Sequence, residues 1–180
     1  WCDEMMTVGR IRRSLAATIQ TTTPSAFPPL YYILMNLWCR IFGYSEFALR
    51  LPSVIFSMLG ILFSFVLAKD MFGWKIALTA ATFLSLSVYN IHYAQHAKQY
   101  AMVWCLGAAS MAFFYRFIRH GRRWDLAGYV LATAVSVYTL YVGFLFLVIH
   151  YVALFVFRLE KNKRRDWFLG QIVLVASFLP

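Results

Sequence analysis

Two groups of polar side chains, set in an otherwise apolar chain, have the types needed for chemistry. The first is an acidic pair, Asp3 and Glu4, and the second runs through Tyr89, Asn90, His92, Tyr93, Gln95, His96, Lys98 and Tyr100. A carboxylate can accept the proton of a reacting hydroxyl, and a Lys or His can stabilise a departing phosphate. Together they suit group transfer from a phosphate-linked donor to a hydroxyl. A loop rich in Tyr, His and Gln is, however, also typical of a hydrated membrane interface.

The composition predicts the scaffold that must hold these groups. The chain has 180 residues, of which 62% are hydrophobic and 13% are charged, whereas soluble domains are about 45–50% apolar and about 25% charged. We therefore expect an all-α, polytopic transmembrane helix bundle. The net charge of +10 is clustered in short loops between long uncharged stretches. That distribution favours the orientation of membrane spans over a nucleic-acid interface, so the expected partners are membrane lipids and no nucleic acid.

The cysteines give no sign of a disulfide framework or a metal site. Cys2, Cys39 and Cys105 form no closely spaced pair, and the last two sit in apolar runs, where a cysteine is usually a small hydrophobic residue. The sequence implies no cofactor, and it does not support a divalent metal.

Charged residues mark the limits of the expected spans, because a span needs about 20 apolar residues. We predict one membrane domain over residues 1–180, with an outer loop over 1–50 and spans near 51–68, 76–91, 99–117, 126–139, 142–157 and 167–180. The chain begins at Trp1 and stops at Pro180 inside an apolar run, so we interpret it as a fragment that lacks an N-terminal span and a C-terminal portion.

Lysine and arginine predict the orientation of the spans. The Arg-rich loop 116–123 and the basic loop 158–165 both resemble cytoplasmic loops. An even number of spans must then connect them, which favours a tight hairpin near 138–143 over a single long tilted helix. The same parity puts 69–75 on the cytoplasmic side and both 44–52 and 92–98 outside. Trp74, Trp124 and Trp167 fall beside the predicted cytoplasmic loops, where interfacial tryptophans are common.

The segment 28–43 could be a short span, but we expect a helix lying in the membrane interface. Tyr32, Asn36 and Arg40 recur at every fourth residue and form a polar stripe. Pro28 and Pro29 suit the first turn of this helix, Gly43 suits its end, and Pro52 suits the start of the next span. This arrangement leaves Arg10, Arg12 and Arg13 outside, against the usual charge rule, where they can meet lipid phosphates.

Four blocks, in order and in register, resemble motifs of one family. They are Trp1-Cys2-Asp3-Glu4 (W-x-D-E), Phe27-Pro28-Pro29-Leu30-Tyr31-Tyr32 (H-P-P-L-Y-Y), Phe42 to Ser53 (F-G-x-S-E-x-A-L-R-L-P-S) and Tyr93 to Tyr100 (Y-A-Q-E-A-R-x-Y). The family is that of the polyprenyl-phosphate-sugar-dependent glycosyltransferases of the GT-C class, which includes protein O-mannosyltransferases and aminoarabinose transferases. The resemblance covers residues 1–100 closely and the remainder mainly by its pattern of spans.

The resemblance implies a mannosyltransferase-like, inverting enzyme of the cell membrane, with its active site on the extracytoplasmic side of the cell envelope. Asp3 would be the general base, and Glu4 would support it. Lys98 stands where the family has a cation near the lipid phosphate. The other expected substrate-binding residues are His96, Tyr93, Gln95, Tyr100 and Arg50, although Arg50 also suits an interfacial anchor. The donor would be a sugar on a polyprenyl phosphate, and the acceptor hydroxyl stays open among lipid, glycan and protein.

Because the sequence departs from the family pattern at three positions, two alternative functions remain open. Phe27 and His96 stand where the family has His and Glu, and Leu140 replaces a His that is frequent in relatives. These changes favour slightly a non-catalytic membrane scaffold that retains the fold. A transporter or flippase is the other alternative, but such proteins place charges within spans and show repeats, whereas the charges here lie at the ends of spans.

Overall fold

The computed structural model describes residues 2–12, 28–156 and 161–178, and within these ranges the regular structure is helical throughout, which confirms the all-α prediction. The elements are α1 (Cys2–Ile11), α3 (Leu30–Phe42), α4 (Glu46–Phe72), α5 (Trp74–Leu86), α6 (Val88–Ala94), α7 (Tyr100–His120), α8 (Arg123–Thr139), the 3₁₀ turn η1 (Tyr141–Gly143), α9 (Phe144–Val156) and α10 (Lys161–Phe178). Phe27 and Arg13 lie outside the described residues.

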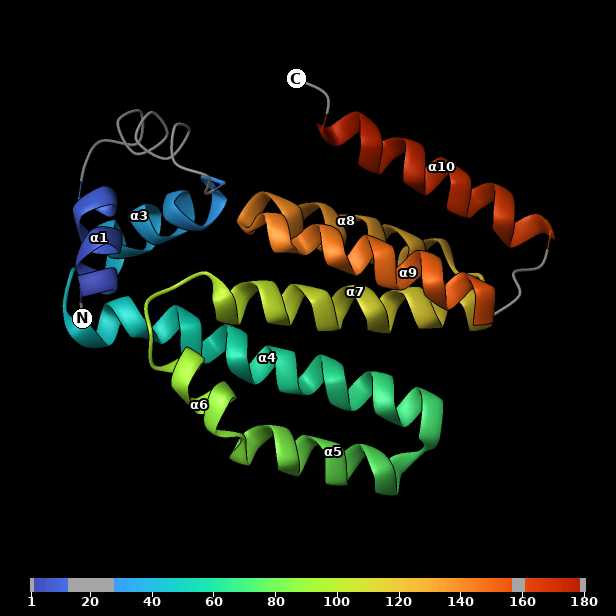
Figure 1. Ribbon diagram of the computed structural model, residues 1–180, viewed down its shortest axis with the longest axis horizontal. Coiled ribbons are helices and arrows are strands. Elements are labelled where there is room, and N and C mark those ends of the chain that lie inside the picture. The colour runs from blue at the N-terminus through green and yellow to red at the C-terminus, as the bar shows by residue number, and fades with distance from the viewer. Residues whose placement is uncertain (1, 13–27, 157–160, 179–180) are drawn as a thin grey trace.

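Helix α7 forms the centre of the bundle and packs against α4 on one side and α8 on the other (Figure 1). It buries the small residues Ala101, Gly107, Ala109 and Ser110 together with Phe114 and Phe117. At 1.5 Å per residue, α7 is roughly 30 Å long and α4 roughly 40 Å, enough for a hydrocarbon core of about 30 Å. Among the described residues these two helices have the length and composition of membrane spans, and Leu30–Phe42, Trp74–Leu86 and Tyr141–Leu154 are shorter apolar helices.

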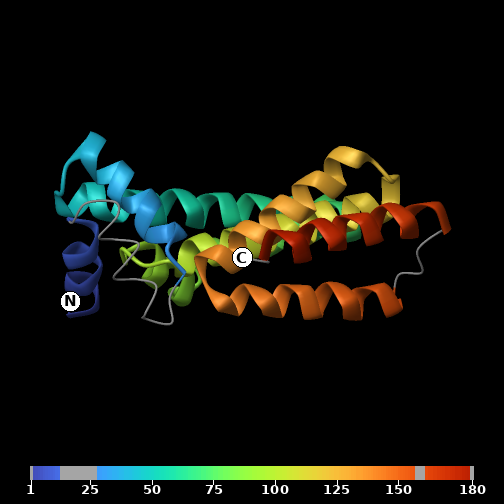
Figure 2. The same ribbon diagram turned by 90° about the horizontal axis from the view of Figure 1, so that it is seen from above.

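The two ends of the bundle carry different elements. At one end lie α1, α3, the start of α4 and the chain between α6 and α7, whereas the α4–α5 and α7–α8 connections lie at the other end (Figure 1). Figure 2 shows the same separation along the long axis and shows α1 running across it. Segments that the charge pattern assigns to opposite sides of a membrane therefore lie at opposite ends of the molecule.

Helix α4 begins earlier than the sequence predicted. Ser45 caps it, because the Ser45 hydroxyl accepts a hydrogen bond of 3.2 Å from the backbone N–H of Ala48. Glu46, in the first turn, is favourably placed for the helix dipole. Pro52 consequently lies inside the helix and does not start it, which corrects our interpretation.

The predicted span 76–91 is divided in the structure. Helix α5 ends at Leu86, Ser87 is extended, and α6 begins at Val88. Asn90 stabilises the break: it donates a hydrogen bond of 3.1 Å to the carbonyl of Leu84 and accepts one of 2.8 Å from the Ser57 hydroxyl of α4. Hydroxyl and amide side chains compete in this way with helical hydrogen bonds, so a run containing Ser85, Ser87 and Asn90 supports a kink.

The long apolar run 126–157 forms two helices. Helix α8 ends at Thr139, Leu140 is extended, and η1 leads into α9. Helix α9 is fixed to the bundle through His150, which is fully buried and lies 3.1 Å from the Ser110 hydroxyl of α7 and against the carbonyl of Phe146. The hairpin alternative is thus the one that the structure adopts.

Helix α3 buries two of the three residues of its polar stripe and exposes the third, Arg40. Tyr32 and Asn36 are buried, whereas Ile41 is 76% exposed. Asn36 donates a hydrogen bond of 2.7 Å to the carbonyl of Ile11, so it satisfies a terminal carbonyl of α1. The helix stops at Gly43, as predicted, where φ is +83°.

The end opposite α1 is basic, and polar contacts connect its helices. The Asp70 carboxylate forms an ion pair of 2.5 Å with Arg116, which joins α4 to α7. Asp70 lies in the segment 69–75, which the charge pattern assigns to the cytoplasmic side, and its carboxylate is therefore paired and not simply a solvated surface charge. Lys163 of α10 donates a hydrogen bond of 3.0 Å to the carbonyl of Ile118 near the end of α7, where a cation is favoured by the helix dipole.

Candidate functional site

The polar segment identified in the sequence spans the end of α6 and its connection to α7. Helix α6 ends at Ala94, a short connection covers 95–99, and α7 begins at Tyr100. Buried Ala97 and Gln99 hold this connection against the bundle, with exposed fractions of 2% each. The backbone N–H of Lys98 donates a hydrogen bond of 2.8 Å to the carbonyl of His96, which fixes a compact turn. Lys98 and His96 are half-buried, and Gln95 is exposed.

The two histidines of the segment form a pair. Their rings lie 4.2 Å apart, and Nδ1 of His96 donates a hydrogen bond of 2.7 Å to the backbone carbonyl of His92. That contact assigns the proton of a neutral His96 to Nδ1. Nε2 of His96 then remains an acceptor, or becomes a donor when the ring is protonated. The arrangement suits an interaction with a phosphate or a hydroxyl.

A cavity of about 330 Å³ opens beside the α5–α6 break. Half of its lining residues are aromatic, and the lining comprises Leu84, Ser87, Tyr89, Asn90, Tyr93, Tyr100, Ala101 and Trp104. The rings of Tyr93 and Tyr100 lie 5.2 Å apart at this cavity. Because Ser87 and Asn90 both create the kink and line the cavity, the break in the helix is what provides the space. Two of the predicted substrate-binding residues, Tyr93 and Tyr100, are thereby brought together.

The other predicted residues surround this region without lining the cavity. The 95–99 connection, next to the cavity, carries Gln95, His96 and Lys98. Arg50 lies in the first turns of α4, where it forms an ion pair of 2.8 Å with Glu46 one helical turn away. That pairing within one helix is also what an anchoring role for Arg50 would produce.

Asp3 and Glu4 lie in the first turn of α1, and their side chains fall outside the described part of the structure. What can be described is how α1 is attached. Arg10 donates a hydrogen bond of 3.1 Å to the Tyr32 hydroxyl and lies 5.2 Å from that ring. Ile11 is fully buried against α3 in a cluster that reaches Met102 of α7. This cluster joins the acidic helix to the helix that follows the His/Lys segment.

Burial raises the pKa of Tyr32 above its usual value, and the Arg10 charge and hydrogen bond act against that rise. A smaller raising effect comes from Tyr100. Tyr32 therefore lies within electrostatic range both of α1 and of the first residue of α7. This relationship, together with the views in Figures 1 and 2, puts α1 and the 95–99 connection at one end of the bundle.

Comparison with known protein families identifies the family to which the chain belongs. The family model described as dolichyl-phosphate-mannose-protein mannosyltransferase matches residues 26–180. The chain belongs to this family. No curated protein and no solved structure gives a significant match. The matched residues include the polar segment, the cavity and Arg50, whereas Asp3 and Glu4 precede them.

Membership of the mannosyltransferase family identifies the chain as a membrane glycosyltransferase of mannosyltransferase type, and the family's description names a lipid-linked sugar donor. Within the described residues, no group of three or more His, Cys, Asp and Glu side chains is arranged to hold a metal ion.

Sequence reasoning missed several residues at the end of the bundle that carries the candidate site. The indole of Trp104 lines the cavity one turn after Tyr100, a spacing that places both on one helical face and could have revealed it. Two buried oxygens, Gln99 Oε1 and Ser53 Oγ, have no hydrogen-bond partner among the described residues. Unsatisfied buried polar atoms are rare and call for an explanation such as a bound molecule. No sequence pattern marks Ser53, because its burial depends on tertiary contacts.

Proposed function

We propose that this protein transfers a sugar from a polyprenyl-phosphate donor to an acceptor hydroxyl on the extracytoplasmic side of the membrane. The observation that carries the proposal is the presence of the acidic helix α1, the His/Lys connection and the aromatic cavity at one end of a bundle that belongs to a mannosyltransferase family. A lipid-linked donor also explains why the enzyme is embedded, since its substrate stays in the bilayer.

In the proposed reaction, Asp3 accepts the proton of the acceptor hydroxyl, and Glu4 supports the acidic site. The acceptor oxygen attacks the anomeric carbon of the sugar, and the bond from that carbon to the phosphate oxygen breaks. The polyprenyl phosphate leaves with the bonding electrons, and its negative charge is balanced by Lys98 and His96. Attack opposite the departing phosphate inverts the anomeric centre.

Two features of the site support separate roles for its residues. Tyr93 and Tyr100 offer aromatic faces and hydroxyls around a space of about 330 Å³, which suits a pyranose ring because such a ring has both apolar faces and hydroxyl groups. Lys98 and His96 lie on the adjacent connection, so they can meet a phosphate at the edge of this space. The unsatisfied Gln99 Oε1 adds an acceptor for a substrate hydroxyl.

The decisive experiment substitutes Asp3→Asn in the full-length protein and measures transfer from polyprenyl-phosphate mannose to acceptor. We expect a loss of at least about 100-fold, the lower end of what a general base supplies. Asp125→Asn is the matched control, because Asp125 lies in the first turn of α8 at the opposite end. Unchanged transfer by the Asp3 variant would remove Asp3 from the mechanism. Absence of transfer in the parent protein would favour a non-catalytic membrane protein.

Cysteine labelling tests the side of the membrane. In a background without the three native cysteines, Gln95→Cys and Arg122→Cys place one thiol on an exposed position at each end of the bundle. We expect an impermeant maleimide added outside intact cells to label position 95 and to spare position 122. The reverse pattern would contradict an extracytoplasmic site while leaving membership of the family intact.

A further inference from the structure

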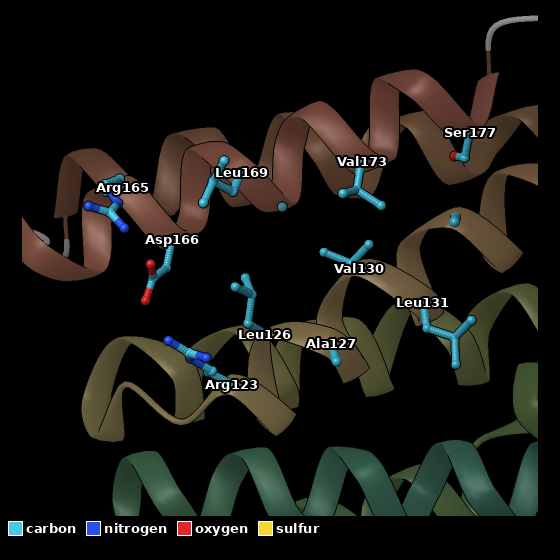
Figure 3. A pocket seen from close by; sticks show the side chains of 12 residues that line it. Arg123, Leu126, Ala127, Val130, Leu131, Arg165, Asp166, Leu169, Val173 and Ser177 are labelled. Atoms are coloured by element: carbon cyan, nitrogen blue, oxygen red, sulfur yellow. The ribbon is translucent and has the colours of Figure 1, made fainter.

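A second cavity lies far from the candidate site, along the outer side of α8 and α10. Its volume is about 700 Å³, and most of its lining is apolar. Figure 3 shows Leu126 and Val130 of α8 facing Leu169 and Val173 of α10 across a groove, and Leu131 of α8 is also part of the lining. Leu131 is 67% exposed and Val173 is 58% exposed, so this lining is open to whatever surrounds the bundle.

One end of the groove is charged. Arg123 of α8 and both Arg165 and Asp166 of α10 lie close together there, with Asp166 between the two arginines in the view of Figure 3. These three side chains make no hydrogen bond or ion pair with one another or with any other described residue. Their formal charges sum to +1. The groove thus combines an apolar channel with a mouth that complements one negative charge.

At the opposite end, a hydrogen bond bridges the two helices. The Tyr138 hydroxyl of α8 donates a hydrogen bond to the backbone carbonyl of Ser177 in α10, and this contact ties the two helices together. Between the ends, α8 and α10 come close at Gly170, where a Cβ would lie 3.2 Å from Leu126 and from Val130. The floor of the groove is therefore narrow, and its shape suits an extended chain better than a helix.

The dimensions match one leaflet of a bilayer. The lining runs from Arg123 to Ala134 on α8 and from Arg165 to Ser177 on α10, which is roughly 17 Å at the helical rise per residue. Half of a hydrocarbon core is about 15 Å. Trp124, 87% exposed beside the charged mouth, is the residue type that marks the headgroup region.

We propose that this groove binds one anionic glycerophospholipid from the leaflet that faces the basic loops. Its phosphate is bound at the charged mouth by the guanidinium groups of Arg123 and Arg165, whose two positive charges exceed the single negative charge of Asp166, and one acyl chain follows the apolar lining toward Ser177. Paired arginines recognise phosphate by several N–H donors, and basic recesses between spans are known sites for anionic headgroups. The inference is independent of the reaction proposed above, because the groove lies at the other end of the molecule.

The test uses the full-length protein, purified in detergent, stripped of lipid and incubated with phosphatidylglycerol or phosphatidylcholine of equal chain length. Native mass spectrometry then counts the bound lipid. We expect one phosphatidylglycerol to be retained in preference to phosphatidylcholine. The double variant Arg123→Gln with Arg165→Gln should weaken retention roughly 30-fold. Arg122→Gln with Arg164→Gln removes the same charge from exposed neighbours that do not line the groove, and it should retain the lipid.

A second pair of variants tests the apolar part without changing charge. Val173→Trp fills the groove from an exposed position, whereas Val175→Trp adds the same bulk at a position that is 61% exposed and does not line it. Only Val173→Trp should lose the lipid, with both proteins melting like the parent. Equal retention of the two lipids, equal losses in matched variants, preference for a polyprenyl phosphate, or a parent that retains no lipid would each overturn the proposal.

Discussion

The indole nitrogen of Trp38 donates a hydrogen bond of 2.9 Å to the backbone carbonyl of Ala48. That carbonyl lies four residues before Pro52, which has no N–H to complete the helical pair. The contact therefore satisfies a buried acceptor inside α4 and at the same time fixes α3 to the first turns of α4. Since α3 also holds α1, the position of the acidic helix depends on this bond.

Replacing Trp38→Phe should lower the free energy of unfolding by about 1–3 kcal/mol, because the Ala48 carbonyl becomes a buried acceptor without a donor. Denaturation in mixed micelles measures the change. The informative comparison is the same substitution in a Pro52→Ala background, where residue 52 regains an N–H that can bond to Ala48. The cost of losing Trp38 should be smaller there. An equal cost in both backgrounds would show that the indole contributes by its size and not by its hydrogen bond.

The cavity at the candidate site depends on close approach between α4 and α7. A Cβ added at Gly60 would lie 2.3 Å from the Trp104 ring, whose other side lines the cavity. Gly60→Ala should therefore displace Trp104 and reduce stability by about 1–3 kcal/mol, and it should weaken donor binding, seen as a raised KM for the lipid-linked sugar. Adding Trp104→Phe should restore stability because the smaller ring leaves room for the methyl group. Failure of that rescue would indicate that the Gly60 methyl disturbs α4 itself.

The sequence predicted the architecture well where the signal is local. Apolar runs bounded by charges mark the long helices, and Gly43 marks the end of α3. The break at Leu140 followed from a global argument, since two basic loops on one side require an even number of spans between them. Which residues of α3 are buried could not be predicted from a local signal of this kind. Asn36 looks like a surface residue in sequence, but it lies against the last carbonyls of α1, and only tertiary structure brings that partner close.

At the candidate site, too, the sequence pattern could not predict what depends on tertiary contacts. Tyr93 and Tyr100 were identified because polar aromatic residues gathered in one short segment. The cavity between them could not be predicted, because it arises from the interruption of a span at Ser87 and from Ser57 on another helix, which holds Asn90. Periodicity reports which face of a helix is apolar, but it does not report where two helices leave a space between them.

Tyr32 makes the attachment of α1 sensitive to alkaline pH. Burial raises the pKa of this hydroxyl in the folded protein, so near pH 10 the folded state binds more protons than the unfolded state. The contribution to stability is then complete below the usual tyrosine pKa of about 10 and is lost as pH rises through the folded value. Unfolding measured across this pH range should show a steeper alkaline loss in the parent than in Tyr32→Phe. Equal slopes would mean that Tyr32 ionises as freely in the folded state as in the unfolded state.

A substitution at Gln99 can separate an effect on stability from an effect on sugar transfer. It is 2% exposed at the start of α7, and its Oε1 lacks a partner among the described residues. Replacing a buried unsatisfied polar group by an apolar one of similar shape is close to neutral or stabilising, so Gln99→Leu should melt at or above the temperature of the parent. If Oε1 accepts a hydrogen bond from the substrate, the same variant should lose transfer by roughly 10-fold or more, as expected for one hydrogen bond to a bound hydroxyl. A variant that is both stable and fully active would assign the unsatisfied oxygen to a buried water, and one that is inactive only because it unfolds would assign Gln99 to the fold alone.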